Sequence, residues 1–383
     1  MVLQQPTAAT STPTATSRVL ALVPPARTSS VLWRQLWPIA TLNARGHPVG
    51  TAIADPARTD WLAAAAGCDV LVLPRFHVPT AVLPGVAAYF EALRRQGTVI
   101  VGDYDDHLWL PDEEAGRWFW ATTATPFGLV PTRRPGPGEV APLAERLASL
   151  RLLDAVTVNT PATANVVRGL TDAPVAVVPS LLDVSWFRAV KDAIPRLVPP
   201  LTIGFAGAIR NASDLAALAE AWGRVAARCP AVTFVTFTDP APVLVGAVPR
   251  DRHIHIPRTE LDRYPVGYAS IDIGCAAVDT HPASLCRSPN KVVEYGAAGA
   301  AVVASHALYG DLIRDGENGL LATTADEWED ALARLVADAA LRARLAGALT
   351  AVVDRDWALD RHAPRWLAAW ADLRAAVLVG EGR

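Results

Sequence analysis

The sequence contains little cysteine, methionine or charge. Its 383 residues include one methionine and four cysteines, and charged residues make up only 19% of the chain. The cysteines, Cys68, Cys229, Cys275 and Cys286, show neither the paired spacing of a zinc site nor a disulfide framework. This pattern favours a reducing compartment, and we expect a cytoplasmic protein with no metal or other cofactor.

Strong net charge and long apolar runs are also missing. The formal net charge is −3, which predicts no bulk attraction to nucleic acid. No apolar run reaches the ~18 residues of a membrane span. Residues 1–17 are rich in Ala, Thr, Ser and Pro without an apolar run, so we expect a disordered tail there and not a signal peptide.

The chain is instead rich in hydrophobic residues, which recur in a regular pattern. They make up 51% of the sequence, and the length suits two domains of about 150 residues each. Short apolar runs alternate with helical patterns, which indicates parallel sheets built from βαβ units. The predicted strands are 18–23, 47–54, 69–74, 98–102, 155–158 and 174–178, then 201–206, 231–236, 253–256, 271–277 and 300–305.

We therefore predict an α/β protein with two Rossmann-like, doubly wound domains facing a cleft, and ligands at the carboxyl ends of the strands. The first domain would span 18–180 and the second 201–355, with a linker at 181–200. The last segment, 356–383, would be a helix that packs back toward the first domain. The segment 110–138, rich in Trp, Pro, Gly and Thr, is predicted to be irregular.

The stretch around Ser288 combines a helix start with an unusual charge pattern. Ser288 suits the N-cap and Pro289 suits the first helical position. Arg287 and Lys291 put positive charge at the positive end of the helix dipole, which is unfavourable unless an anion such as a phosphate binds there. Glu294 follows on the same face as Lys291. The pattern suits a nucleotide diphosphate beside a sugar hydroxyl pair; the alternative is a plain surface helix with a Lys291–Glu294 pair.

A second anion site is predicted after the strand at 201–206. Gly207 lets a ligand approach the backbone, and Arg210 adds positive charge just before the next helix. The loop lacks the G-x-G-x-x-G fingerprint of nicotinamide cofactors, which disfavours that ligand. The alternative is an exposed arginine in a surface loop.

Carboxylates gather after the strand at 98–102. Asp103, Asp105, Asp106 and His107 would all lie at the cleft edge. Asp103 and Asp105 suit a divalent metal ion, because hard cations take carboxylate ligands. Asp106 or His107 instead suits the orientation or deprotonation of an acceptor hydroxyl. A solvated loop that caps a helix is the third interpretation.

Two arginines, Arg27 and Arg75, follow the first and third predicted strands and are candidates to contact a ligand at the same edge. For Arg75 and the neighbouring His77, an ion pair within the loop is the alternative. Cys286 lies beside the Ser288 helix, but no histidine is placed in sequence to activate its thiol, so we interpret it as a small packing residue.

At Ser288–Ser305 the sequence resembles a known family. The run SPNKVVEYGAAGAAVVAS, followed by Tyr309 and IRDGENGLL, resembles the donor-binding half of retaining glycosyltransferases with the GT-B fold. The group most similar is the family-four-like sugar transferases of bacterial polysaccharide and O-antigen clusters. The resemblance covers 201–355 and includes GFAGAIRNASDL. In the first half, VTVNTPATANVV, VAVVPSLLD and VIVGDYDDHLW extend it.

The resemblance implies a GT-B fold and metal-independent transfer of a sugar from a nucleotide-diphosphate sugar to a carbohydrate or lipid-linked acceptor. Glu294 would bind the donor ribose hydroxyls, while Lys291 and Arg210 would stabilise the departing diphosphate. The remaining donor-binding residues would be Gly207, Arg287, Ser288, Pro289, Asn290, Ser305 and Tyr309. When the residues after the predicted strands are added to those that the resemblance implies, the expected catalytic set is Asp106, His107, Arg210 and Lys291. The acceptor would contact Arg27, Arg75, Asp103 and Asp105.

The sequence also departs from the family pattern at two places. Many relatives carry two glutamates separated by seven residues, and Cys286 occupies the first of these positions here. Pro24-Pro25-Ala26-Arg27 stands where relatives often have a glycine-rich loop. These departures keep three other hypotheses open: a sugar-nucleotide-binding subunit without catalysis, a metal-dependent transferase that uses Asp103 and Asp105, and a nucleotide-sugar epimerase.

Aromatic and basic residues in the segment 110–138 suggest one more partner. Trp118-Phe119-Trp120 and Arg133-Arg134 suit a peripheral contact with a membrane or a lipid-linked acceptor. The alternative is that these aromatic residues pack as a lid or within the core.

Overall fold

The computed structural model describes most of the chain. The described residues are 17–23, 31–53, 65–118, 121–125, 128–133, 140–194, 201–207, 212–238, 241–257, 259 and 263–380.

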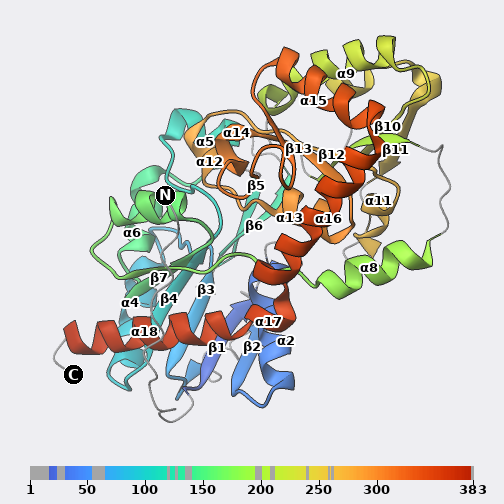
Figure 1. Cartoon of the computed structure of the whole chain (residues 1–383). Coiled ribbons are helices and arrows are strands. Elements are labelled where there is room, and N and C mark those ends of the chain that lie inside the picture. The colour runs from blue at the N-terminus through green and yellow to red at the C-terminus, as the bar shows by residue number, and fades with distance from the viewer. Residues whose placement is uncertain are drawn as a thin grey trace.

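The first half of the chain forms a six-stranded parallel sheet, in the order β2-β1-β3-β4-β7-β8 (Figure 1). Every residue of β3 and β4 is buried, because helices cover both faces of a parallel sheet. The strands are β1 Val19–Val23, β2 Val49–Ile53, β3 Val70–Pro74, β4 Val99–Tyr104, β7 Ala155–Val158 and β8 Val175–Val177.

The second half forms another six-stranded parallel sheet, in the order β11-β10-β9-β12-β13-β14. Its first strand, β9, lies in the middle, and the direction in which strands are added reverses between β9 and β12. Such a reversal opens a crevice at the carboxyl ends of the two strands. The strands are β9 Thr202–Ala206, β10 Thr233–Thr238, β11 His253–Pro257, β12 Ile273–Ala276, β13 Ala301–Ser305 and β14 Leu320–Ala322. The prediction of two doubly wound parallel-sheet halves is confirmed.

Helices fill the connections between strands in both halves. Those up to residue 168 are the π-helix η1 Leu32–Leu36, then α2 Trp37–Ala44, α4 Leu83–Arg94, α5 Asp112–Trp118, α6 Leu143–Leu150 and α7 Pro161–Arg168. From residue 184 to 309 they are α8 Val184–Ala193, η2 Ala212–Leu215, α9 Ala216–Arg228, α10 Pro242–Val245, η3 Arg250–Arg252, α11 Val266–Ala269, α12 Pro282–Leu285, α13 Asn290–Ala297 and α14 His306–Tyr309. The last four are α15 Ala325–Ala337, α16 Ala339–Asp356, α17 Leu359–His362 and α18 Pro364–Gly380.

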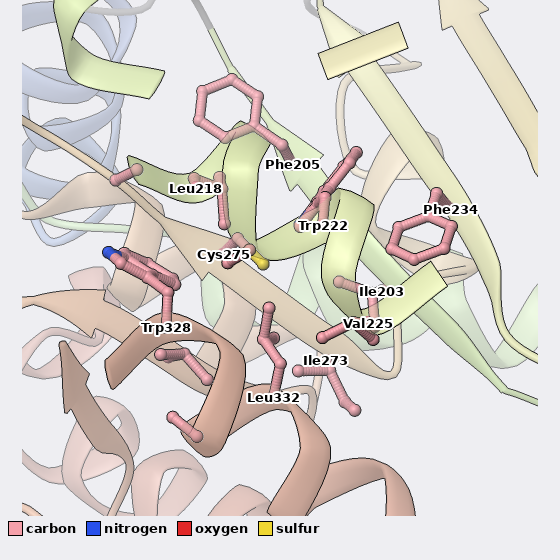
Figure 2. Close-up of a cluster of buried hydrophobic side chains, with 14 of the residues drawn as sticks. Ile203, Phe205, Leu218, Trp222, Val225, Phe234, Ile273, Cys275, Trp328 and Leu332 are labelled. Carbon is pink, nitrogen blue, oxygen red and sulfur yellow. The ribbon is translucent and has the colours of Figure 1, made fainter. Parts of the chain in front are cut away.

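The core of the second half follows directly from helical periodicity. Leu218, Trp222 and Val225 recur on one face of α9, and all three are fully buried against the sheet. Figure 2 shows this cluster, in which Trp222 lies beside Phe234 and α15 adds Trp328 and Leu332. Full burial of each large side chain stabilises the fold by roughly 1.5–3 kcal/mol.

The structure differs from two predictions about connecting segments of the chain. The segment 110–138, predicted to be irregular, contains α5 and an antiparallel ribbon of β5 Ala121–Thr125 and β6 Gly128–Arg133, so that prediction was wrong. Its Thr-rich and Val-containing runs are β-formers that pair with each other and not with the main sheet. The segment predicted as a linker, 181–200, carries α8, which Asp183 caps by accepting a hydrogen bond from the Trp186 amide.

The end of the chain returns to the first half. Helix α18 runs along the first sheet and contacts β7 and β8 (Figure 1), and it buries Trp366 and Trp370 there. The chain therefore crosses between the halves twice, and the two crossings are joined where Leu182 pairs with Ala358. Among the described residues, no helix combines the length and the apolar character that a membrane span requires.

Candidate active site

The crevice of the second sheet begins where β9 and β12 separate. The two strands pair only at two positions, the last being Gly204 with Gly274. Tyr295, from α13, fills the space beyond: its hydroxyl accepts a hydrogen bond from the Ala206 amide at 2.8 Å and lies 3.2 Å from the Gly204 carbonyl. A Cβ on Gly274 would lie 2.4 Å from the Tyr295 ring, so glycine is needed there. This contact fixes α13 at the crevice.

One turn of α13 carries Glu294, a buried carboxylate that is only 1% exposed. Its Oε2 accepts hydrogen bonds from the hydroxyls of Tyr268 and, at 3.2 Å, Tyr264. Its Oε1 is also buried and has no hydrogen-bond partner among the described residues. Burial raises the pKa of Glu294 to about 7, while the phenol hydrogen bonds and the charge of Lys291 act in the opposite direction. A helix that buries its carboxylate in this way is not the plain surface helix of the alternative interpretation.

Lys291 lies on the same helix and reaches the end of β9. Gly207 has φ +99°, and a Cβ placed on it would lie 3.3 Å from Lys291 Cε. The Lys291 ammonium also lies 5.5 Å from the centre of the Phe205 ring. The structure thus brings together Gly207 and Lys291, which the sequence placed in two separate predicted anion sites.

The start of α13 differs from the prediction. The helix begins at Asn290 with Pro289 as its N-cap, and no side chain caps it, so Ser288 is not the N-cap. The Ser288 hydroxyl instead lies 3.0 Å from Asn159 Nδ2 and 3.1 Å from the Ser180 hydroxyl, both of which come from the first half of the chain. The Ser288 hydroxyl, which would otherwise cap the helix, therefore takes part in contacts between the two halves.

Three other predicted donor residues lie at the same edge of the second sheet. Arg287 is buried and pairs with Asp214 at 2.8 Å. The Ser305 hydroxyl accepts a hydrogen bond from the Val278 amide at 3.0 Å. Tyr309 is buried, which raises the pKa of its phenol. The contacts of Arg287 and Ser305 show how the loops after β12 and β13 are held in place.

At the edge of the first sheet, Asp103 is enclosed by protein. It is 3% exposed and accepts four hydrogen bonds, two from Arg34 and one each from Gln35 and Thr157. Four donors fill the lone pairs of a carboxylate, which leaves no acceptor site for a sugar hydroxyl or a metal ion. The expectation that Asp103 binds the acceptor is therefore corrected: Asp103 holds η1 against β4 and β7.

Asp105 and Asp106 share one arginine. Arg75 Nε lies 2.6 Å from Asp105 Oδ1, and Arg75 Nη2 lies 2.6 Å from Asp106 Oδ2. Arg75 has φ 47°, a left-handed conformation that no other non-glycine residue of the described chain adopts. His77 Nε2 lies 2.8 Å from Glu145 Oε1. The interpretation of Arg75 as a partner in loop ion pairs is confirmed. Burial lowers the pKa of His77, so its contact with Glu145 is not an ion pair near pH 7. The acceptor roles of Arg75 and Asp105 stay predictions.

His107 lies where the two halves meet. Burial lowers its pKa, and the nearby His281 of the second half lowers it further, so the imidazole is neutral near pH 7. Nε2 of His281 lies 3.3 Å from Glu114 Oε2 of the first half.

The Cys286 thiol is also buried, which raises its pKa to about 11, and a protonated thiol fits the packing role predicted for it.

Several sequence predictions lie outside what the structure describes. Arg27 and Arg210 lie outside the described residues. The same holds for the side chains of Trp118-Phe119-Trp120 and Arg133-Arg134, the suggested membrane contact.

The comparisons with known proteins fit this geometry. Residues 200–338 match the family model Glycosyl transferases group 1. No curated protein matches the chain at a significant level. Sucrose-phosphate synthase from Thermosynechococcus elongatus is similar in structure, with a TM-score of 0.60 at 15% identity over 94% of this chain and 99% of its own.

Two more solved structures share the architecture. HepE from Anabaena, in complex with UDP, has a TM-score of 0.61 at 14% identity over 93% of this chain and 100% of its own. A glycosyltransferase from Rickettsia africae has a TM-score of 0.62 at 11% identity over 93% of this chain and 98% of its own. The fold is therefore GT-B, as the sequence resemblance implied.

The segment that matches the glycosyltransferase model contains Gly207, Lys291 and Glu294, but the site also depends on residues that sequence reasoning missed. Tyr264 and Tyr268 bond to Glu294 from a part of the chain with no recognised motif. Asn159 lies in the first half and reaches Ser288. In the sequence the two tyrosines show only an i,i+4 spacing. This spacing does not predict their contact with Glu294.

Proposed function

We propose that the protein is a glycosyltransferase that moves a sugar from a nucleotide-diphosphate sugar to an acceptor hydroxyl. The observation that carries the proposal is Glu294: one oxygen is held by two phenols, and the other is buried with no hydrogen-bond partner among the residues that the structure describes. A buried polar atom of this kind calls for a partner, and a ribose hydroxyl of the donor would supply it. Lys291 lies one turn away, within the segment that matches the glycosyltransferase family.

The chemistry proposed for the site is stabilisation of the leaving diphosphate. As the bond to the sugar breaks, negative charge builds on the diphosphate while the sugar becomes positively charged. The Lys291 ammonium and the positive end of the α13 helix dipole would stabilise that charge, and both are in position before the reaction. Arg210 would add a second positive charge from the loop after Gly207. HepE binds UDP in its solved structure, which supports a nucleotide-sugar donor here.

The first half would supply the acceptor site. Asp106 and the neutral imidazole of His107 lie at the junction with the second half, where they would orient the acceptor hydroxyl and take its proton.

We propose a carbohydrate or lipid-linked acceptor in bacterial polysaccharide synthesis and a hexosyl donor. We also propose that the reaction retains the configuration of the sugar, needs no metal and takes place in the cytoplasm. Transfer that is lost on chelation and restored by manganese or magnesium would contradict the metal-free proposal.

The decisive experiment uses the only two lysines of the sequence. UDP-glucose, GDP-mannose and related nucleotide sugars are screened for an increase in melting temperature, which a bound donor raises by mass action. Lys291→Ala should weaken binding of the stabilising donor by about tenfold or more, since it removes a charge-assisted bond to phosphate. Lys191→Ala is the matched control, because Lys191 belongs to α8 and donates to the Ala298 carbonyl. Unchanged donor affinity and transfer in Lys291→Ala would contradict the site.

A second candidate function is a sugar-nucleotide-binding subunit without catalysis. The observation in its favour is Cys286, a buried and protonated thiol where many relatives place a carboxylate. Calorimetric binding of a nucleotide sugar with no transfer to a broad panel of acceptors would favour this candidate. Conversion of the donor sugar in the absence of acceptor would instead indicate an epimerase.

A further inference from the structure

The two phenols that bond to Glu294 form a small hydrogen-bonded unit. Tyr268 lies on α11 and is fully buried, and Tyr264 lies one turn earlier. Their hydroxyls are 2.9 Å apart, and both lie within hydrogen-bond distance of Glu294 Oε2. One carboxylate oxygen offers about two acceptor positions, so the phenols occupy Oε2 fully. The other oxygen of Glu294 remains for a ligand.

Aromatic rings from three other segments hold the phenols in place. The ring of Trp33, from η1 of the first half, lies 5.9 Å from the ring of Tyr264. Phe187 of α8 lies 5.6 Å from Tyr268. Phe237 of β10 lies 5.6 Å from Tyr264 and 5.8 Å from Tyr268. Tilted and edge-on rings at these separations attract each other and restrict rotation, so neither hydroxyl is free to turn away from Glu294.

The charged and titratable groups around Glu294 can be named. Tyr264 and Tyr268 face it from the α11 side, and Lys291 faces it from the same helix. Tyr295, on α13, and Tyr309, on α14, also interact with its charge. Burial favours the protonated carboxyl, whereas the two phenol donors and Lys291 favour the carboxylate. The phenols and Lys291 therefore oppose the larger effect of burial on the pKa of Glu294.

We propose that Tyr264 and Tyr268 are positioning residues that bind Oε2 of Glu294 and direct Oε1 alone to a hydroxyl of the bound nucleotide sugar. This inference rests on the proposed function, because it names how the donor site is prepared. The acceptor half takes part through Trp33, whose ring packs on Tyr264. Loss of either hydroxyl should make Glu294 harder to ionise and so weaken binding at neutral pH.

The test compares Tyr268→Phe and Tyr264→Phe with the native protein, both with and without ligand. Without ligand, the Glu294 carboxyl is titrated by carbon-13 NMR, and its signal is assigned by its absence in Glu294→Gln. We expect the native midpoint near pH 7 and an upward shift of about one unit in Tyr268→Phe, because a donor to the ionised form is lost. Tyr104→Phe is the matched control: its buried hydroxyl donates to the Phe76 carbonyl at 2.9 Å, away from Glu294.

With ligand, affinity for UDP-glucose or GDP-mannose is measured by calorimetry between about pH 5.5 and 8.5. These diphosphate diesters do not titrate in that range, so changes report on the protein. Affinity should fall as pH drops through the Glu294 midpoint, and this fall should begin at higher pH in Tyr268→Phe, with about fivefold weaker binding near pH 7. Tyr104→Phe should keep the native profile even if its melting temperature falls.

The outcomes separate the two proposals. An unchanged Glu294 midpoint in both tyrosine variants overturns the positioning role, whatever the ligand data show. A loss of affinity by the same factor at every pH also overturns it, because that result describes general damage to the site. If no nucleotide sugar binds the native protein while the midpoint shifts as expected, the positioning of Glu294 by the phenols stands and the proposed function fails.

Discussion

At the scale of single residues, Glu294 has a consequence for stability that is independent of any ligand. Its pKa is about 7 in the folded protein, against an ordinary value of 4.5. Between these two pH values the folded state holds the proton more tightly than the unfolded chain does. The stability contributed by this group is therefore present at low pH and is lost as pH rises through 7. His77, His107 and His253, whose pKa values are lowered by burial, act with the opposite sign.

We predict that Glu294→Gln removes this part of the pH dependence. From pH 5 to pH 8 the native protein should lose up to about 3 kcal/mol that the variant does not lose. Urea unfolding at several pH values measures the difference between the two profiles, in which the histidine contributions cancel. Any constant effect of the amide also cancels, because slopes are compared. Parallel profiles for the two proteins would show that Glu294 titrates near its ordinary value.

At the scale of elements, the site depends on how α13 meets the gap between β9 and β12. The Tyr295 hydroxyl replaces the strand-to-strand hydrogen bonds that end at Gly204 and Gly274. The ring of Tyr295 packs closely over Gly274 and lies 5.4 Å from the ring of Tyr268. The glycine is therefore a requirement of helix packing, and the position of Glu294 follows from it.

We predict that Gly274→Ala destabilises the protein by about 1–3 kcal/mol, because the new Cβ would lie 2.4 Å from a ring that is held on several sides. Donor affinity should fall as well, because α13 must move. Thermal unfolding and nucleotide-sugar calorimetry measure the two effects. Gly85→Ala in α4 is the matched control, since its Cβ would meet nothing within 4 Å and alanine favours helices by up to about 1 kcal/mol. Equal stability of Gly274→Ala and the native protein would refute the packing argument.

At the scale of the whole molecule, Asn159 connects the two halves at the site. Its Nδ2 lies within 3.0 Å of the Cys286 carbonyl and the Ser288 hydroxyl of the second half, and 2.9 Å from the Asp105 carbonyl of the first. Thr163 supports the same contact at 2.9 Å from the Cys286 carbonyl. The acceptor edge and the start of the donor helix are thus joined through one amide.

We predict that Asn159→Ala loosens the contact between the halves, with a loss of about 1–2 kcal/mol. Small-angle scattering should show a larger radius of gyration, and amide exchange at 286–290 should be faster. Asn318→Ala is the matched control, because Asn318 is also buried and, among the described residues, its side chain bonds to Leu312 and Arg314 of the second half. If both variants change scattering and exchange equally, the bridging role of Asn159 is wrong.

The sequence by itself determined the parts of this protein that depend on local pattern. The alternation of apolar runs and helical patterns predicted both sheets, and the helical spacing of Leu218, Trp222 and Val225 matches the face of α9 that is buried. Lys291 and Glu294 were found on one helix because i,i+3 neighbours share a face whatever the rest of the chain does. The resemblance at residues 288–305 supplied the GT-B fold.

Only the tertiary structure decided which polar atoms those residues have as partners. Asp103 looks like a ligand-binding carboxylate in sequence, but Arg34, Gln35 and Thr157 occupy all of its oxygens. By its local sequence Ser288 suits a helix cap. In the structure its hydroxyl instead contacts Asn159, which is 129 positions away in sequence. Hydrogen bonds between distant segments depend on the packing of whole sheets and helices, and local periodicity does not predict them.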